Sequence, residues 1–135
     1  MKYYLEPLNI SHWDIFSKVD KVGHVEPFIA TKEMEIGETV FFHICKSGTN
    51  RQSGIYAIGK IVSKPYISVN DPNDKCYGKN TVDIEITHID KERPYFPVEY
   101  YKGRINSFRS VRRISNESLI DDMIETLKIK NINIE

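Results

Sequence analysis

Residues 39–45 read TVFFHIC, an almost continuous run of apolar and aromatic side chains. A second run of this kind, IYAIGKIV at residues 55–62, follows the polar stretch 46–54. Short apolar runs bounded by turn residues are typical of strands that are buried on both faces. The two runs therefore predict the centre of a sheet that is covered on both sides. Gly59 inside the second run predicts a bulge or a close approach of another chain segment.

Weaker strand signals lie on either side of this pair. Residues 82–87 (VDIEIT) alternate between apolar and polar side chains, which predicts a strand with one buried face. Residues 3–5 predict a short strand that Pro7 ends, and residues 111–114 predict a last short strand. Polar residues, proline and glycine dominate 68–80, so this segment is expected to be an exposed loop.

Two helices are predicted, one near each end of the chain. Ser11 is expected to cap a short helix that reaches Val19, followed by a loop-like stretch at 23–27. Ser115 is expected to cap a C-terminal helix whose apolar stripe consists of Leu119, Ile120, Met123, Ile124 and Leu127. A strand-rich middle between helices predicts an α+β fold, with residues 1–135 forming one domain on a small curved sheet or barrel.

The overall composition argues against partners attracted by net charge and against a membrane or secreted location. The 19 basic residues balance the 19 acidic ones, so no net field draws the protein to nucleic acid or to a membrane. Any affinity for nucleic acid must therefore come from a local patch. No apolar run is long enough for a signal peptide or a bilayer span, and a cytoplasmic location without a membrane partner is expected.

Metal and cofactor motifs are absent from the sequence. His43 and Cys45 share one strand face, and Cys76 or His88 would have to complete a site, but the paired spacings of structural zinc sites do not occur. Neither the phosphate-binding loop nor the dinucleotide fingerprint occurs. We therefore expect no metal and no cofactor.

Catalytic motifs are also absent, and we expect no enzyme activity. No G-x-S-x-G elbow occurs, and a cysteine inside a buried strand is usually inert. Asp83 and Glu85 share one strand face and are the only carboxylate pair that suggests a two-metal nuclease. An exposed strand face explains this pair better, although a small metal-dependent nuclease remains an alternative.

One stretch of the chain is strongly basic. Residues 102–113 contain five cations and no acid. Five cations suffice to hold several phosphates, so the residues expected to contact a nucleic-acid backbone are Lys102, Arg104, Arg112 and Arg113. The alternative is that these charges are simply solvated, or are offset by Asp121, Asp122 and Glu125.

Aromatic side chains are the second class that suits nucleic acid, because their flat faces stack on unpaired bases. The aromatic residues near or in the predicted strands are Trp13, Phe28, Phe41, Phe42 and Tyr56. Aromatic residues at such positions usually belong to the core, and we expect at least half of these five to do so.

Two segments resemble the EVE domain family: MEIGETVFF at 34–42, and SGIYAIGKI at 53–61, which is followed by Pro65. The segment SVRRIS at 110–115, before the final helix, is similar to that family as well. The resemblance implies a PUA-like fold, a small mixed β-barrel with flanking helices, related in shape to YTH domains. EVE domains are regarded as readers of modified bases, often attached to restriction or nuclease modules.

The resemblance also implies where a base would bind. It places a polar base-edge contact at Asn9 and a cage tryptophan in the loop 24–28, where this sequence has no tryptophan and Trp13 is expected in the core. The hollow is expected between the strands that carry Val40 and Ile55. The candidate base-binding residues are Asn9, Val25, Glu26, Phe28, Ser47, Tyr56 and Arg109.

These observations lead to one principal hypothesis and several alternatives. The chain is expected to be a non-catalytic module that reads a modified, for example methylated, base flipped out of DNA or RNA, alone or with a separate nuclease or restriction partner. A general RNA-binding domain of the PUA or ASCH type, the small nuclease above, and a pure protein-interaction domain remain open.

Overall fold

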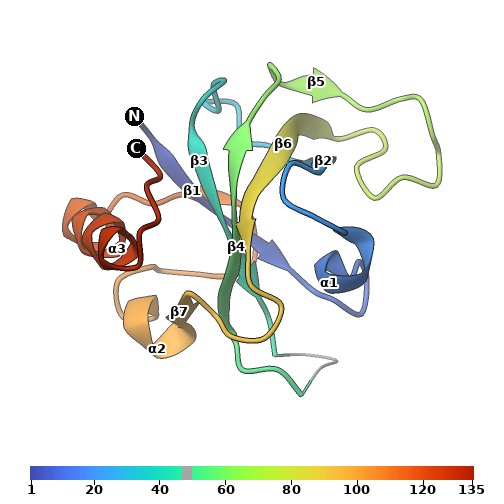
Figure 1. The fold of residues 1–135 in the computed structure, drawn as a ribbon. Helices are drawn as coiled ribbons and strands as arrows, with labels where there is room; N and C mark the ends of the chain where they lie inside the picture. The colour runs from blue at the N-terminus through green and yellow to red at the C-terminus, as the bar shows by residue number, and fades with distance from the viewer. Residues whose placement is uncertain (47–49) are drawn as a thin grey trace.

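The computed structural model describes residues 1–46 and 50–135. Within them, the strands form one mixed sheet in the order β2-β6-β4-β3-β1-β8, with β5 beside β6 and β7 beside β4 (Figure 1). The strands are β1 Tyr3–Leu8, β2 Val25–Ile29, β3 Thr39–Ile44, β4 Gly54–Ile61, β5 Tyr66–Ile67, β6 Asn80–Ile89, β7 Phe96–Pro97 and β8 Arg112–Arg113. The helices are α1 Ile15–Lys18, α2 Val98–Tyr101 and α3 Glu117–Ile129.

The sheet curls into a half-barrel with a separate core on each face. Figure 1 shows α1 on one side of the sheet and α2 with α3 on the other. The core on the α1 side contains Phe16, Phe42 and Ile84, and the core on the α3 side contains Phe41 and Leu127. The α+β class and the barrel-like architecture predicted from the sequence are thus confirmed.

Strand β3 lies at the centre of this arrangement and is buried over its whole length, as its sequence predicts. Val40, Phe42 and Ile44 point into the core on the α1 side, while Phe41 points into the opposite core. Alternate residues of a strand face opposite sides of a sheet, so a strand between two cores needs apolar side chains at nearly every position.

Strand β1 runs parallel to β3 and continues through Pro7, where the sequence predicts its end. The carbonyl of Leu8 accepts a hydrogen bond from the Cys45 amide, on the β3 side. The nitrogen of Pro7, one residue earlier, therefore points to the outer edge of the strand. Because β8 pairs only with Tyr4 and Leu5, that edge is free at Pro7. A proline on a free edge breaks no ladder hydrogen bond.

Both helix caps lie closer to their helices than the sequence suggests. The Asp14 carboxylate accepts from the Phe16 amide at 2.9 Å, so α1 begins at Ile15. Ser11 lies in a turn instead, where its amide and hydroxyl donate to Asn9 Oδ1. Asn116 rather than Ser115 caps α3, because its side chain accepts from the Leu119 amide.

The prediction of a loop at 23–27 is wrong in part, because strand β2 begins at Val25 and pairs with β6 along its full length. Proline is tolerated there since β2 is an edge strand of the sheet. The short elements β5, β7 and α2 have four residues or fewer each, and none of them is predicted from the sequence. Within the described residues, no helix combines the length and apolar character that crossing a bilayer requires.

Replacing Gly59 by alanine should destabilise the protein by roughly 1–3 kcal/mol, the usual cost of overpacking. The pairing of β4 with β6 shifts register between Ile58 and Gly59, as the predicted bulge requires. An added Cβ would lie 2.5 Å from Ile84 Cγ2 and 2.8 Å from the Glu85 carbonyl oxygen. Urea denaturation would measure the loss. The control is Gly103→Ala, whose Cβ would meet no atom within 4 Å, and equal effects of the two changes would contradict this packing.

Candidate functional site

A cleft of about 240 Å³ lies between the end of β1 and strand β2. It opens into an outer hollow that shares His12, Trp13 and Lys75 with it and reaches the loop before β6. The residues that line the cleft are Glu6, Pro7, Leu8, Asn9, His12, Trp13, Phe28, Ile29 and Lys75. Its volume is slightly below the range of roughly 300–1,000 Å³ typical of small-molecule pockets, which suits one flat ring.

The sheet topology explains why a cleft forms at this place. Strand β2 is one edge of the sheet, and β1 lies beside the short strand β8 at the other edge. The curl of the half-barrel brings these edges toward each other, and the cleft has lining residues from both strands. β8 pairs only with Tyr4 and Leu5, so among the residues that the structure describes no strand lies on the outer side of β1 from Glu6 onward.

An aromatic wall forms one side of the cleft. The ring centroids of Trp13 and Phe28 are 5.4 Å apart with perpendicular planes, and Phe28 packs on Phe42 at 4.8 Å. Phe28 is only 1% exposed, whereas Trp13 is half-buried. Trp13 therefore presents ring surface to the cleft while Phe28 anchors that wall to the core.

A cation covers this wall from the loop before β6. The ammonium nitrogen of Lys75 lies 4.4 Å from the centre of the Trp13 ring and 4.9 Å from that of Phe28, within the range of cation–π attraction. It also lies 3.2 Å from a carboxylate oxygen of Glu26, whose other oxygen is 2.8 Å from His24 Nε2. The outer part of the cleft is thus polar and charged.

Glu6 supplies a buried acid to the same cleft. It is 4% exposed, and its Oε2 atom has no hydrogen-bond partner among the described residues. Burial raises the pKa of the Glu6 carboxyl well above its ordinary value, while the charge of Lys75 acts in the opposite direction. An orphaned buried oxygen is costly, and a ligand that donated a hydrogen bond to it would remove this cost.

The residues predicted to bind a base are only partly brought together. Asn9 and Phe28 line the cleft, and Glu26 lines the outer hollow. Val25 is 50% exposed and lies one residue before Glu26 on β2, which places it on the opposite face of that strand. Ser47 lies outside the described residues.

The two remaining candidates lie apart from the lining of the cleft. Tyr56 is 2% exposed, packs edge-on against Phe16 and donates its hydroxyl hydrogen bond to the Gln52 carbonyl. Arg109 is exposed in the loop before β8. The hollow expected between the strands of Val40 and Ile55 is not there, because β3 and β4 are hydrogen-bonded neighbours and both residues are fully buried. Four of the five aromatic candidates are core residues, as expected.

The sequence pattern does not reveal Glu6, Trp13 or Lys75 as cleft residues. Trp13 precedes the short helix α1 instead of lying within it, which turns its ring toward β2. The one signal available in the sequence for Glu6 was an acid inside an otherwise apolar strand segment, because acids are seldom fully buried unless they are paired. Lys75 lies in a loop whose path no local pattern predicts.

The basic stretch of 102–113 is partly neutralised by acids from elsewhere in the chain. Arg104 pairs with Asp122 at 2.7 Å, and Arg113 pairs with Glu33 at 3.4 Å. Lys102 is exposed beyond α2. The expected offset by acids of α3 therefore holds for Arg104.

The metal and nuclease candidates do not assemble into a site within the described residues. No three His, Cys, Asp or Glu side chains there are close enough together to hold a metal ion. His43 Nδ1 lies 2.5 Å from the Tyr101 hydroxyl, and its ring stacks on Phe108. Burial lowers the pKa of His43 to about 4. Asp83 accepts a hydrogen bond from the Tyr66 hydroxyl.

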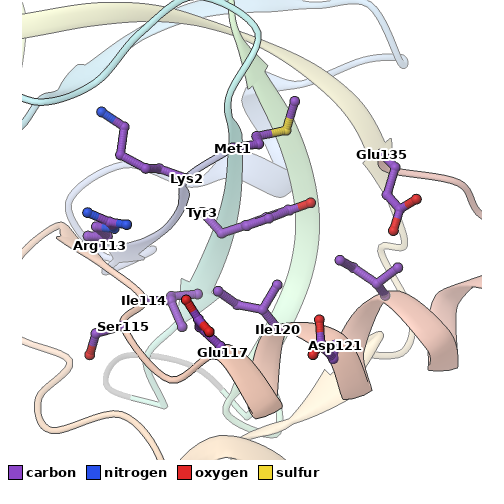
Figure 2. Close-up of a pocket in the computed structure, with 11 residues that line it drawn as sticks. Met1, Lys2, Tyr3, Arg113, Ile114, Ser115, Glu117, Ile120, Asp121 and Glu135 are labelled. Atoms are coloured by element: carbon purple, nitrogen blue, oxygen red, sulfur yellow. The ribbon is translucent and has the colours of Figure 1, made fainter.

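A larger cavity of about 620 Å³ lies between the start of β1 and helix α3 (Figure 2). Figure 2 shows Lys2 and Arg113 at one end of it, and Asp121 and Glu135 toward the other. Its lining is thus of mixed charge, and Tyr3 is the aromatic residue among its lining side chains.

A mixed half-barrel flanked by helices, open to a cleft where its edges approach, is a PUA-like fold of the α+β class. No protein-family model and no curated protein matches the sequence. Solved structures do match. A protein from Pseudomonas syringae superimposes with a TM-score of 0.65 and 18% identity, over 92% of this chain and 99% of that one.

Two further matching structures contain a bound nucleic acid. Human THYN1, crystallised in complex with DNA that contains 5-methylcytosine, matches with a TM-score of 0.58 and 16% identity, over 93% of this chain and 98% of that one. The YTH domain of Mmi1, in complex with RNA, matches with a TM-score of 0.54 and 10% identity, over 98% and 82%. These likenesses concern the fold, and they confirm the PUA-like architecture, related to YTH domains, that the EVE resemblance implies.

Replacing Glu6 by glutamine should stabilise the ligand-free protein more at pH 7.5 than at pH 4.5. The raised pKa keeps the folded carboxyl protonated where the unfolded one ionises, so the wild type loses stability as pH rises above about 4.5. Glutamine is an uncharged isostere and removes this loss, which amounts to at most about 1.4 kcal/mol per pH unit. Urea denaturation at both pH values would measure it. Glu99→Gln, at an exposed position, controls for net charge, and a pH-independent gain at Glu6 would contradict the burial argument.

Proposed function

We propose that this protein is a nucleic-acid-binding module that accepts one flipped, modified base in the cleft between β1 and β2 and does not catalyse a reaction. The observation that carries the proposal is the cleft itself: Trp13 offers a flat ring, and Glu6 offers an orphaned polar atom close to it. A flat apolar wall with one convergent polar group is what a heterocycle requires.

The comparisons support nucleic acid as the partner. Two proteins of the same fold were crystallised with methylated DNA and with RNA, and each of these structures matches more than nine-tenths of this chain. The likeness in sequence is low, so the chemistry of the site must decide the ligand. The comparisons give no support for a separate nuclease partner.

The physical demands of reading a modified base agree with the composition of the cleft. A methyl group adds no hydrogen bond, so it must be recognised by shape and by contact with apolar surface. Trp13, Phe28 and Leu8 supply that surface, and base–aromatic stacking contributes roughly 1–3 kcal/mol per base. A base that stacks on the face of Trp13 covered by Lys75 would displace this ammonium group from the ring toward its carboxylate partner, Glu26.

Glu6 is suited to read the hydrogen-bonding edge of the base. A protonated carboxyl group presents one donor and one acceptor side by side, and the raised pKa of Glu6 favours this form. The Watson–Crick edge of cytosine or adenine presents an amino donor beside a ring-nitrogen acceptor. The carboxyl group would then form two hydrogen bonds with the base, and one of them would involve Oε2, which has no partner among the described residues of the ligand-free protein.

Replacing Trp13 by alanine should abolish the preference for a modified base, because it removes the stacking surface. The measurement is fluorescence anisotropy with matched oligonucleotides that contain cytosine, 5-methylcytosine, adenine or N6-methyladenine, as DNA and as RNA, at low and moderate salt. We expect a loss of affinity for the preferred oligonucleotide of about 5- to 150-fold, the equivalent of roughly 1–3 kcal/mol.

The conservative variant Trp13→Phe keeps a flat ring and should retain most of the preference. Equal affinity of the wild-type protein for modified and unmodified oligonucleotides, with all binding lost as salt rises, would leave only non-specific attraction and refute the reader proposal. A preference for structured RNA regardless of modification would favour a general RNA-binding module instead.

Glu6→Leu should weaken binding of the preferred base at least tenfold, whereas Glu6→Gln should weaken it much less. Leucine leaves the edge of the base without partners, while glutamine still presents one donor and one acceptor. The same anisotropy titrations would compare the two variants, after thermal melts have shown that both are folded. If both variants bound like the wild type, Glu6 would have no part in base recognition.

A further inference from the structure

A second, strongly polar pocket lies on the opposite side of strand β1 from the cleft. It has a volume of about 290 Å³ and is formed by the loop after α2, strand β8 and the residues that lead into α3. Its polar lining comes from Arg104, Asn106, Arg112, Arg113, Ser115 and Asn116, and none of its lining residues is acidic. We call it the arginine pocket.

Arg112 is the central group of this pocket. Its Nε atom is buried and has no hydrogen-bond partner among the described residues. No ion pair within the described part of the chain involves its guanidinium group either. A buried guanidinium donor without a partner is costly, and the group that satisfies such donors best is a carboxylate or phosphate bound through two oxygens.

The neighbouring cations are already oriented by acids at the rim. Asp122 holds Arg104 at 2.7 Å, and the Tyr100 carbonyl accepts a second hydrogen bond from the same guanidinium group. Glu33 lies 3.4 Å from Arg113. These pairs are exposed and reduce the positive charge at the rim, so Arg112 is the cation whose charge is left for a ligand.

The arginine pocket and the cleft are connected through β1. Arg112 lies opposite Leu5 in the antiparallel pair of β8 and β1, and Glu6 is the next residue of β1. Opposite residues in a pair share a face, so Arg112 lies on the face of Leu5 and α3, while Glu6 lies on the face of the cleft. The two sites therefore lie on opposite faces of the sheet, beside neighbouring residues of β1.

We propose that the arginine pocket binds a backbone phosphate of the strand whose flipped base occupies the cleft, with the nucleic acid crossing the edge of the sheet at β8. This inference rests on the proposed function. The ligand is a phosphodiester, held by the two-pronged guanidinium group of Arg112 and the polar side chains around it. The contact is independent of base identity, because phosphates carry no sequence information.

The test is a salt titration of binding with Arg112→Gln. The probes are a single-stranded oligonucleotide with the preferred modified base and its unmodified counterpart, measured by anisotropy between 50 and 200 mM salt. Loss of one phosphate contact should weaken both complexes by the same several-fold factor and reduce the steepness of log K against log salt by about 0.7, the value for one contact to a single strand. The ratio of the two affinities should stay as in the wild type.

Two further variants separate a ligand contact from general charge or folding effects. Lys64→Gln removes an exposed charge between β4 and β5 and should leave affinity nearly unchanged. Arg112→Lys keeps the positive charge but loses the planar guanidinium group that can donate two parallel hydrogen bonds. This variant should therefore keep the salt slope and recover only part of the affinity. Should thermal melts show Arg112→Gln to be unfolded, the Arg112 side-chain signal of the wild-type protein decides the test instead.

Nuclear magnetic resonance of the Arg112 side chain gives a direct readout. The Nε–H signal should shift on titration with the unmodified oligonucleotide, at concentrations that follow the anisotropy curve. A shift with inorganic phosphate but not with the oligonucleotide would assign the pocket to a free anion and overturn the proposal. An unchanged salt slope in Arg112→Gln, or an equal loss in Lys64→Gln, would overturn it as well.

The two proposals fail in different ways. If modified and unmodified oligonucleotides bind equally, the base-reading function fails, yet the salt slope and the Arg112 signal still report on the phosphate contact. If Arg112→Gln leaves the slope unchanged while the modified base is still preferred, the arginine pocket fails and the cleft proposal stands.

Discussion

The burial of β3 on both of its faces is the constraint on which the rest of the structure depends. Its alternate side chains enter two separate cores, one closed by α1 and the other by α2 and α3. A strand with no exposed face must lie inside a sheet, and its neighbours β1 and β4 follow from that position. Both sites therefore have to form at the margins of the sheet, where backbone and side chains are still accessible.

Strand β1 connects this core to both sites. Its first half is held between β3 and β8, and its second half has β3 on one side only. The change from paired to free edge occurs at Glu6, so a buried acid stands next to open space and Trp13 can approach it. β8 begins at the same point, because its first residue, Arg112, lies opposite Leu5 and lines the arginine pocket. A short edge strand thus shapes the surroundings of both hollows.

Only some of the residues that line the cleft could be predicted from the sequence. Asn9 and Phe28 were accessible to sequence reasoning, because the resemblance to EVE domains assigns roles to those segments. Trp13 was expected in the core, and it does pack against the core while it lines the cleft. Val25 and Tyr56 illustrate the limit of such reasoning. A residue's position along the chain does not tell whether its side chain faces the cleft, the solvent or the interior.

The sequence by itself determined the central strands, the bulge at Gly59, the apolar stripe of α3 and the α+β class, because these depend on periodicity and local sterics within a few residues. Only the tertiary structure decided that the ends of β1 and β2 meet, that Lys75 lies over Trp13, and that Arg112 has no acidic partner in the part of the chain that the structure describes. The physical reason is that sheet curl and loop paths arise from packing between segments distant in the chain, which no local pattern encodes.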